Sequence, residues 1–195
     1  MITTINEWKK INESKETMTF WHGGNLDRDF DSHKSGQWEY GPGLYLTTQY
    51  DVVQKYARGS RKLYKITVEK GVNINDVYLP IDIILNFVNM YIIKNKKNDV
   101  LTSINNRQKD NKLNAETFLN IIINNNAIKN SQTSILKDFF VNNGIDYSLV
   151  YNAFGWGETM MILFNMKKII SSTVFNSKDR LDDYNFPKTF TTTNI

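Results

Sequence analysis

Phe20-Trp21-His22-Gly23-Gly24 and Gly41-Pro42-Gly43-Leu44-Tyr45-Leu46-Thr47 are the two stretches that decide how this chain folds. Each reads as a short β-strand with glycines beside it, so the pattern places His22 and Tyr45 at the ends of strands. Glycine is typical of positions where another backbone or a flat ligand approaches the main chain closely. An imidazole and an aromatic ring presented in this way predict a slot for a planar, hydrogen-bonding group.

Composition predicts a single folded domain over residues 1–195. The chain is 41% hydrophobic and 13% aromatic, values typical of globular proteins, and it is long enough to bury a core. It contains no cysteine, which excludes disulfides and thiolate chemistry and fits a reducing compartment. The net charge of +4 is spread along the chain, and it is compatible with an acidic protein, a nucleic acid or a dinucleotide as partner.

No membrane association is expected. Residues 1–10 lack the apolar run of a secretory leader, and the longest apolar segment, residues 81–93, is interrupted by Asp82, Asn86 and Asn89. That segment is too short and too polar to span a bilayer. The sequence therefore predicts a soluble protein that acts in the cytoplasm of its host or target cell.

Hydrophobic periodicity predicts an α+β protein. Alternating or short apolar runs predict strands at residues 17–22, 43–47, 63–68, 145–151, 160–164 and 169–175. Helical spacing and end signals predict helices near residues 5–11, from Thr48 to near Gly59, after Pro80, and over residues 134–141 with Gly144 as the stop.

Three other segments are irregular or inserted. Residues 24–40 predict a long loop, and loops of such length inside a domain are usually functional. Residues 80–130 predict a helical insertion rather than a separate domain, because their apolar faces look too few for a core of their own. The tail from Asn176 onward is polar, which predicts that it is loosely held.

Glu158 is the third chemically suggestive residue. It follows the loop Phe154-Gly155-Trp156-Gly157 and stands directly before the apolar run of residues 159–164. A carboxylate that enters a buried strand is costly unless it has a partner or a function. The simpler alternatives are that Glu158 lies at an exposed strand end or pairs with a nearby lysine.

Taken in order, these parts resemble the ADP-ribosyltransferase superfamily, in its His-Tyr-Glu branch of diphtheria-toxin-like and poly(ADP-ribose)-polymerase-like enzymes. Residues 20–24 resemble the first family motif. Residues 43–48 together with Tyr56-Ala57 resemble the second. Gly144-Ile145-Asp146, Glu158 and residues 161–165 resemble the third. The resemblance covers residues 17–175 without the helical insertion, and it implies two small packed antiparallel β-sheets that form an NAD cleft.

The resemblance also implies site residues and a substrate. NAD would be a substrate, and no metal would be needed. Glu158 would face the nicotinamide-side ribose, and His22 would hydrogen-bond the adenosine-side ribose. The implied catalytic residues are Glu158, Tyr45 and His22. The implied NAD-binding residues are His22, Gly23, Gly24, Tyr45, Thr47 and Tyr56.

Two of these residues would hold the nicotinamide ring between them, and a third would read its amide. Tyr45 would stack on the ring and Tyr56 would close its other side. Gly23 would present its main-chain N–H and C=O to the carboxamide, because only glycine lets the ring come that close. His33 with Asp27, Asp29 and Asp31 lies in one loop without the spacing of metal ligands, so these residues predict no metal site.

The acceptor of ADP-ribose stays open. Trp156 stands where arginine-modifying relatives carry Glu or Gln, which argues against an arginine acceptor. A protein is the favoured acceptor. The Asn-, Ile- and Lys-rich composition is typical of an AT-rich bacterial or phage coding sequence and favours a toxin or effector, and residues 80–130 and 24–40 are predicted to recognise the acceptor. The alternatives are a DNA or RNA acceptor, an RNA 2′-phosphotransferase (although the chain has only two histidines) and a non-catalytic interaction module.

Overall fold

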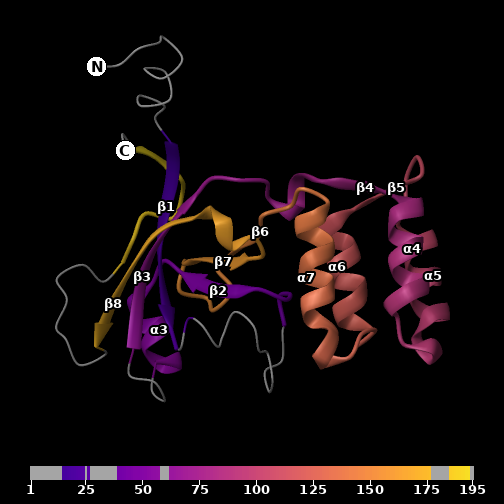
Figure 1. The fold of residues 1–195 in the computed structure, drawn as a ribbon, viewed down its shortest axis with the longest axis horizontal. Coiled ribbons are helices and arrows are strands. Elements are labelled where there is room, and N and C mark those ends of the chain that lie inside the picture. The colour runs from indigo at the N-terminus through magenta and orange to yellow at the C-terminus, as the bar shows by residue number, and fades with distance from the viewer. Residues whose placement is uncertain (1–14, 25, 27–38, 58–61, 177–184, 194–195) are drawn as a thin grey trace, which may run out of the picture.

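The computed structural model describes residues 15–24, 26, 39–57, 62–176 and 185–193, without the side chains of Lys55, Tyr56 and Thr193. Over these residues the chain is α+β, as predicted (Figure 1). The strands are β1 (Lys15–Gly23), β2 (Leu44–Thr47), β3 (Lys62–Glu69), β4 (Tyr78–Pro80), β5 (Lys112–Asn114), β6 (Tyr147–Tyr151), β7 (Thr159–Leu163), β8 (Ile169–Asn176) and β9 (Thr191–Thr193). The α-helices are α3 (Tyr50–Tyr56), α4 (Ile81–Tyr91), α5 (Lys97–Asn105), α6 (Ala115–Asn124) and α7 (Thr133–Asn142), and the 3-10 turns are η1 (Ile74–Asp76), η2 (Lys94–Lys96), η3 (Asn130–Gln132) and η4 (Met166–Lys168).

Seven strands form one antiparallel sheet in the order β6-β7-β2-β1-β3-β8, and β9 also pairs with β1. β1 and β3 pair continuously from Thr17↔Glu69 to Gly23↔Leu63. In contrast, β1 and β2 share a single register pair, Trp21↔Thr47. The sheet therefore consists of two halves, β9-β1-β3-β8 and β2-β7-β6, that are joined at one point. The resemblance implied two separate packed sheets. In the structure, the pairing of β1 with β2 joins the two halves into one sheet.

The two halves cover each other's apolar faces. One core cluster draws its buried residues from both halves, and no described α-helix contributes to it: Met18, Phe20, Leu44, Leu46, Ile66, Val68, Tyr147, Leu149, Met161 and Leu163. Every member is at most 8% exposed, so something must shield these side chains from water. Because β2 runs across the direction of β1 and β3 (Figure 1), the shield of each half is the other half.

The opposite face of β7 is covered by the helical segment. Side chains alternate between the faces of a strand, so Met160 and Ile162 point away from the core of the sheet halves. They join the buried side chains of α4, α6 and α7 in a second core cluster. Phe140 of α7 stacks on Phe164 at a centroid distance of 5.3 Å. The helices thus bury much of this core among themselves and share the rest with the sheet.

α3 and the end of the chain cover the remaining face of β1. Trp21 contacts Tyr50 of α3 edge-on at 5.3 Å and stacks on Phe186 at 5.0 Å. The N–H of Phe186 donates to the carbonyl of Thr48 at 2.9 Å, and β9 pairs with the start of β1. The prediction of a loosely held tail is therefore wrong for residues 185–193. None of the described helices has the length and apolarity that crossing a bilayer requires.

Candidate functional site

The three motif-bearing strands are direct neighbours in the sheet. Trp21 of β1 pairs with Thr47 of β2, and Thr47 pairs with Met160 of β7. One row of residues therefore crosses all three strands. The residues after Thr47 and the residues before Met160 continue toward the same end of the sheet, where the loop that carries Glu158 lies.

His22 holds the point at which β1 and β2 separate. Its side chain is 5% exposed, and Nδ1 lies 3.0 Å from the carbonyl oxygen of Tyr45. Tyr45 and Thr47 direct their main-chain groups toward the same neighbour, because hydrogen-bonding direction alternates along a strand. Past the register pair Trp21↔Thr47, the imidazole of His22 therefore donates to β2 in place of a main-chain N–H of β1.

This bond fixes the tautomer of His22. A carbonyl oxygen only accepts, so Nδ1 carries the proton and donates. Nε2 is then an acceptor in the neutral ring and a donor in the cation. A hydroxyl group can bind either form, because it both donates and accepts.

Gly23 makes room for α3. A Cβ atom at this position would lie 2.5 Å from the carbonyl oxygen of Val53 and 3.0 Å from the nitrogen of Ala57. The sequence interpretation assigned this space to a ligand ring, and the structure places the backbone of α3 there. Gly24 has a φ of 147° and donates its N–H to the carbonyl of Lys62 at 3.2 Å, which continues the pairing of β1 with β3.

The phenol group of Tyr45 stabilises the turn that leads into β2. Its hydroxyl donates to the carbonyl of Gly41 at 2.8 Å and accepts the N–H of Tyr40 at 3.3 Å. Burial raises the pKa of Tyr45 above its usual range, so the group stays protonated and remains a donor. The ring packs against the core of the helical segment.

Thr47 and Thr48 connect the end of β2 to the start of β7. The hydroxyl oxygen of Thr47 accepts the N–H of Gln49 at 3.2 Å. Thr48 is fully buried and makes a reciprocal pair with Thr159: each accepts the other's N–H at 3.0 Å, Thr48 through its hydroxyl and Thr159 through its carbonyl. Since Thr159 follows Glu158 directly, Thr48 fixes the base of the Glu158 loop.

Glu158 is buried, and its partners are main-chain groups of its own loop. The residue is 1% exposed. Oε1 accepts the N–H of Phe154 at 2.5 Å, and Oε2 accepts the N–H of Trp156 at 3.1 Å. Both simpler sequence-based alternatives, an exposed strand end and a lysine pair, are therefore wrong as accounts of the described contacts. A carboxylate has about four acceptor positions, and these two bonds account for two of them.

Aromatic side chains surround this loop on the outside. Tyr151, Phe154 and Trp156 are 63%, 39% and 46% exposed. Exposed aromatic side chains indicate a binding surface where they form one contiguous apolar patch. The Nζ atom of Lys188 lies beside the loop, 3.1 Å from where a Cβ on Gly157 would be.

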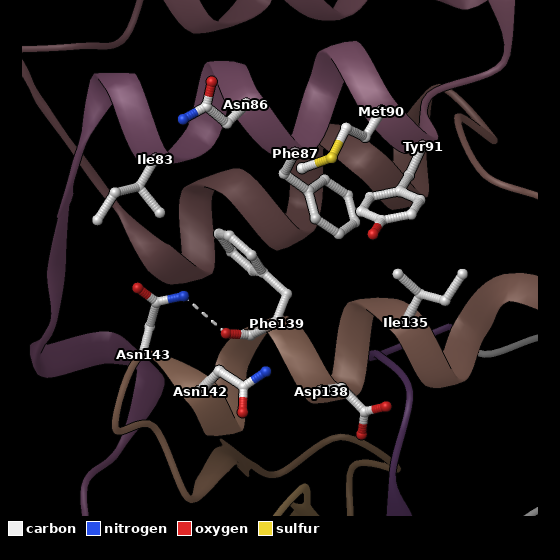
Figure 2. A pocket seen from close by; sticks show the side chains of 10 residues that line it. All are labelled: Ile83, Asn86, Phe87, Met90, Tyr91, Ile135, Asp138, Phe139, Asn142 and Asn143. Carbon is white, nitrogen blue, oxygen red and sulfur yellow. Dashed lines mark hydrogen bonds between the residues drawn. The ribbon is translucent and has the colours of Figure 1, made fainter.

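A groove of about 460 Å³ lies elsewhere, between α4 and α7 (Figure 2). Its aromatic side chains, Phe87, Tyr91 and Phe139, lie close to one another, and Met90 at its rim is 66% exposed. The lining residues are Ile83, Asn86, Phe87, Met90, Tyr91, Ile135, Asp138, Phe139, Asn142 and Asn143. None of them is a predicted site residue.

Some predicted features lie outside the described residues. These are the side chain of Tyr56, His33 and Asp27, Asp29 and Asp31, as well as the helix near residues 5–11 and the stop near Gly59. In the part of the chain that the structure describes, no group of three or more His, Cys, Asp or Glu side chains could hold a metal ion.

Comparison with known proteins finds no matching family model, no matching curated protein and no matching solved structure. A functional assignment therefore depends on the residues and their geometry. The Glu158 loop comprises residues 152–158. The sequence did not reveal that Thr48 holds its base at Thr159, that Gln49 contacts it from outside or that Asn152 closes it from within.

Proposed function

We propose that the protein is an NAD-dependent mono-ADP-ribosyltransferase that modifies a macromolecule. The observation that carries the proposal is the buried carboxylate of Glu158, which two main-chain N–H groups orient beside the end of β2. β2 also carries Tyr45, whose carbonyl oxygen accepts a hydrogen bond from Nδ1 of His22. His22 and Tyr45 thus lie on the neighbouring strands β1 and β2, Glu158 directly precedes the next strand, β7, and the Tyr45 ring packs against the helical segment.

In the proposed reaction the bond between nicotinamide and ribose C1′ breaks, and nicotinamide leaves with the bonding electrons. The transition state resembles an oxocarbenium ion, as in glycoside hydrolysis. A fixed carboxylate stabilises the developing positive charge most where water is excluded. Glu158 would accept a hydrogen bond from the ribose hydroxyl and supply that charge. The acceptor's nucleophile then forms the new bond to C1′ and loses its proton to water.

The other proposed NAD contacts follow the resemblance. His22 would bind the adenosine-side ribose, and Gly23, beside which the backbone of α3 fills the space of a side chain, would position the strand end rather than contact the ring. Tyr45 and Tyr56 would enclose the nicotinamide ring. The Tyr45 hydroxyl is engaged with the carbonyl of Gly41, so Tyr45 would contact the nicotinamide only through the face of its ring. The hydrogen bond to Gly41 would keep that ring in position.

The proposed acceptor is a protein, as for a bacterial or phage effector. A nucleic-acid acceptor is the second candidate, and one observation favours it. Tyr151, Phe154 and Trp156 are exposed around the Glu158 loop, and Lys188 lies next to it. Aromatic rings on which bases stack, together with a cation for phosphate, are the usual means of binding single-stranded nucleic acid.

Labelled NAD tests the function and separates the acceptors. The purified protein is incubated with a bacterial lysate and NAD labelled in the adenylate part, and the product is then treated with protease or nuclease. We expect a label that nuclease leaves in place and protease removes. The reverse result would identify a nucleic-acid acceptor. Binding of NAD without any transfer or hydrolysis would contradict the enzymatic proposal and favour an interaction module.

The helical segment is proposed to contact a protein acceptor through the groove between α4 and α7. Deleting the segment is not a usable test, because its core includes Met160 and Ile162 of the sheet. Met90 is exposed at the rim, so Met90→Glu should leave the fold intact. We expect it to reduce transfer to the acceptor about tenfold more than NAD hydrolysis, since a charge disrupts an apolar contact.

The matched control is Asn98→Glu, which adds the same charge at an exposed position of α5 outside the groove. Transfer and hydrolysis are measured side by side for both variants. If Met90→Glu reduces transfer and NAD hydrolysis equally, or if Met90→Glu and Asn98→Glu behave alike, the groove does not recognise the acceptor.

A further inference from the structure

We propose that Gln49 is a positioning residue for the Glu158 carboxylate. Its Nε2 donates to the carbonyl oxygen of Trp156 at 2.7 Å, across 107 positions of sequence. The N–H of Trp156 donates to Oε2 of Glu158 at 3.1 Å. Trp156 is thus bound through its carbonyl by Gln49 and through its amide by the carboxylate. The catalytic consequence of this arrangement rests on the proposed function.

Many of the loop's hydrogen bonds connect residues within the loop. The N–H of Asn152 donates to the carbonyl of Glu158 at 2.8 Å, and the side-chain oxygen of Asn152 accepts the N–H of Gly157 at 2.7 Å. Asn152, Gly155 and Gly157 have φ values of 56°, 77° and 67°, so the turn uses residues that tolerate the left-handed region. Such bonds define the shape of the loop but not its place on the sheet. Thr48 fixes its base at Thr159, and Gln49 reaches its tip.

The backbone of Gln49 is held by contacts on both sides. Its N–H donates to the hydroxyl oxygen of Thr47 at 3.2 Å, and it forms a β-bridge with Asn185. It is also the residue that immediately precedes α3. The backbone of α3 lies against Gly23 through Val53 and Ala57. Through Gln49, the Glu158 loop is therefore connected to the same helix that packs on the strand end of His22.

The proposal requires the side-chain N–H donor of Gln49. Three variants distinguish the effect of this donor from the effect of side-chain packing. Gln49→Glu has the same shape but presents an acceptor to the carbonyl of Trp156, and Gln49→Met has a similar length with no donor. Gln49→Lys keeps a long side chain that donates. We expect the first two variants to release the tip of the loop and the third to retain it.

Hydrogen exchange of the amides of Phe154 and Trp156 measures the loop directly and needs no activity. Both amides donate to Glu158, so their protection reports whether the carboxylate is held. We expect exchange about tenfold faster in Gln49→Glu and Gln49→Met, because local opening sets the exchange rate. Gln49→Lys should exchange like the parent, and the melting temperature should change little because the bond is exposed. Unchanged exchange in all three variants would overturn the role of Gln49.

The kinetic test uses hydrolysis of NAD by the full chain. We expect kcat to fall about tenfold in Gln49→Glu and Gln49→Met with KM for NAD little changed, because misplacement of a catalytic group affects the chemical step. Gln49→Lys should recover most of kcat. If the parent protein does not cleave NAD, both the catalytic role and the proposed function are wrong. Faster exchange in Gln49→Glu and Gln49→Met would still show that Gln49 holds the loop. An active parent with unaltered kcat in all variants would overturn the positioning role alone.

Discussion

Replacing Glu158 by glutamine is expected to slow NAD cleavage by about a hundredfold to a thousandfold, the usual consequence of removing one electrostatic contact to a transition state. The carboxylate is buried and water is largely excluded from it, which strengthens its interaction with the developing positive charge on the ribose. NAD should still bind, because the variant loses a charge that matters mainly in the transition state. The measurements are the rate of nicotinamide release and the rise in melting temperature on addition of NAD.

The variant also changes the loop, and this effect must be separated from the chemical one. A glutamine has one acceptor oxygen for the two N–H groups of Phe154 and Trp156, and its NH2 group faces the second donor. Gln49→Glu provides the comparison, because it is expected to loosen the same loop while residue 158 keeps its carboxylate. A loss in Glu158→Gln much larger than the loss in Gln49→Glu indicates a direct role of the carboxylate.

Glu116→Gln, a substitution of the same kind on α6, is the matched control and should behave like the parent protein. Cleavage of NAD by Glu158→Gln at nearly the parental rate would show that the carboxylate has been assigned wrongly. The loop bonds would then be the whole explanation for a buried glutamate at this position.

Local patterns predicted most of the regular structure. The strands over residues 17–22, 63–68 and 160–164 are confirmed as β1, β3 and β7, with ends that differ by a few residues. α7 ends as predicted before Gly144, whose φ of 76° suits glycine. In each case the information is contained in neighbouring residues: apolar periodicity for the element, and glycine for its end.

The elements that were missed lack such local information. β9 consists of three threonines, and β4 and β5 have three residues each with one buried leucine. None of these segments has a recognisable period. They are strands because of the partners that the rest of the fold provides, β1 for β9 and each other for β4 and β5.

The contacts of the residues that the resemblance nominated were not predictable from the sequence. The resemblance singled out Gly23 and Glu158, and the structure gives each a structural partner that no pattern revealed: α3 for Gly23 and the loop amides for Glu158. Gln49 and Trp156 meet across 107 positions, so only the assembled sheet brings them together. A sequence pattern can therefore nominate a residue without showing which neighbours hold it.

Among the variants proposed here, replacement of Asp146 by alanine is expected to cause the largest loss of stability, about 2–4 kcal/mol, because it leaves two partly buried donors without their acceptor. Asp146 is 7% exposed and belongs to the third motif. Its Oδ2 accepts the N–H of Val72 at 2.9 Å, and its Oδ1 accepts the side-chain amide of Asn165 at 2.7 Å. The Nζ of Lys168 lies 3.9 Å from Oδ2. One side chain thus joins the segment after β3, the start of β6 and the end of β7.

The same arrangement explains why residue 71 is glycine. A Cβ there would collide with the carboxylate of Asp146, so any other residue at this position would displace that side chain or the backbone. In Asp146→Ala the amides of Val72 and Asn165 lose their acceptor and the packing around Gly71 is lost with it. For a protein of this size the expected loss corresponds to a fall in melting temperature of roughly 5–12 °C. Chemical and thermal unfolding followed by circular dichroism measure both quantities.

Asp146→Asn is the control that separates the hydrogen bonds from the shape of the side chain. Asparagine keeps an oxygen for the N–H of Val72, but its NH2 group faces the NH2 group of Asn165, whose own oxygen accepts the N–H of Lys167 at 3.1 Å. Since one of the two hydrogen bonds is retained, we expect about half of the destabilisation seen in Asp146→Ala. If both variants unfold like the parent protein, Asp146 does not hold the three segments together. If the asparagine variant is as unstable as the alanine variant, the negative charge beside Lys168, rather than the hydrogen bonds to Val72 and Asn165, is the principal source of stability at this junction.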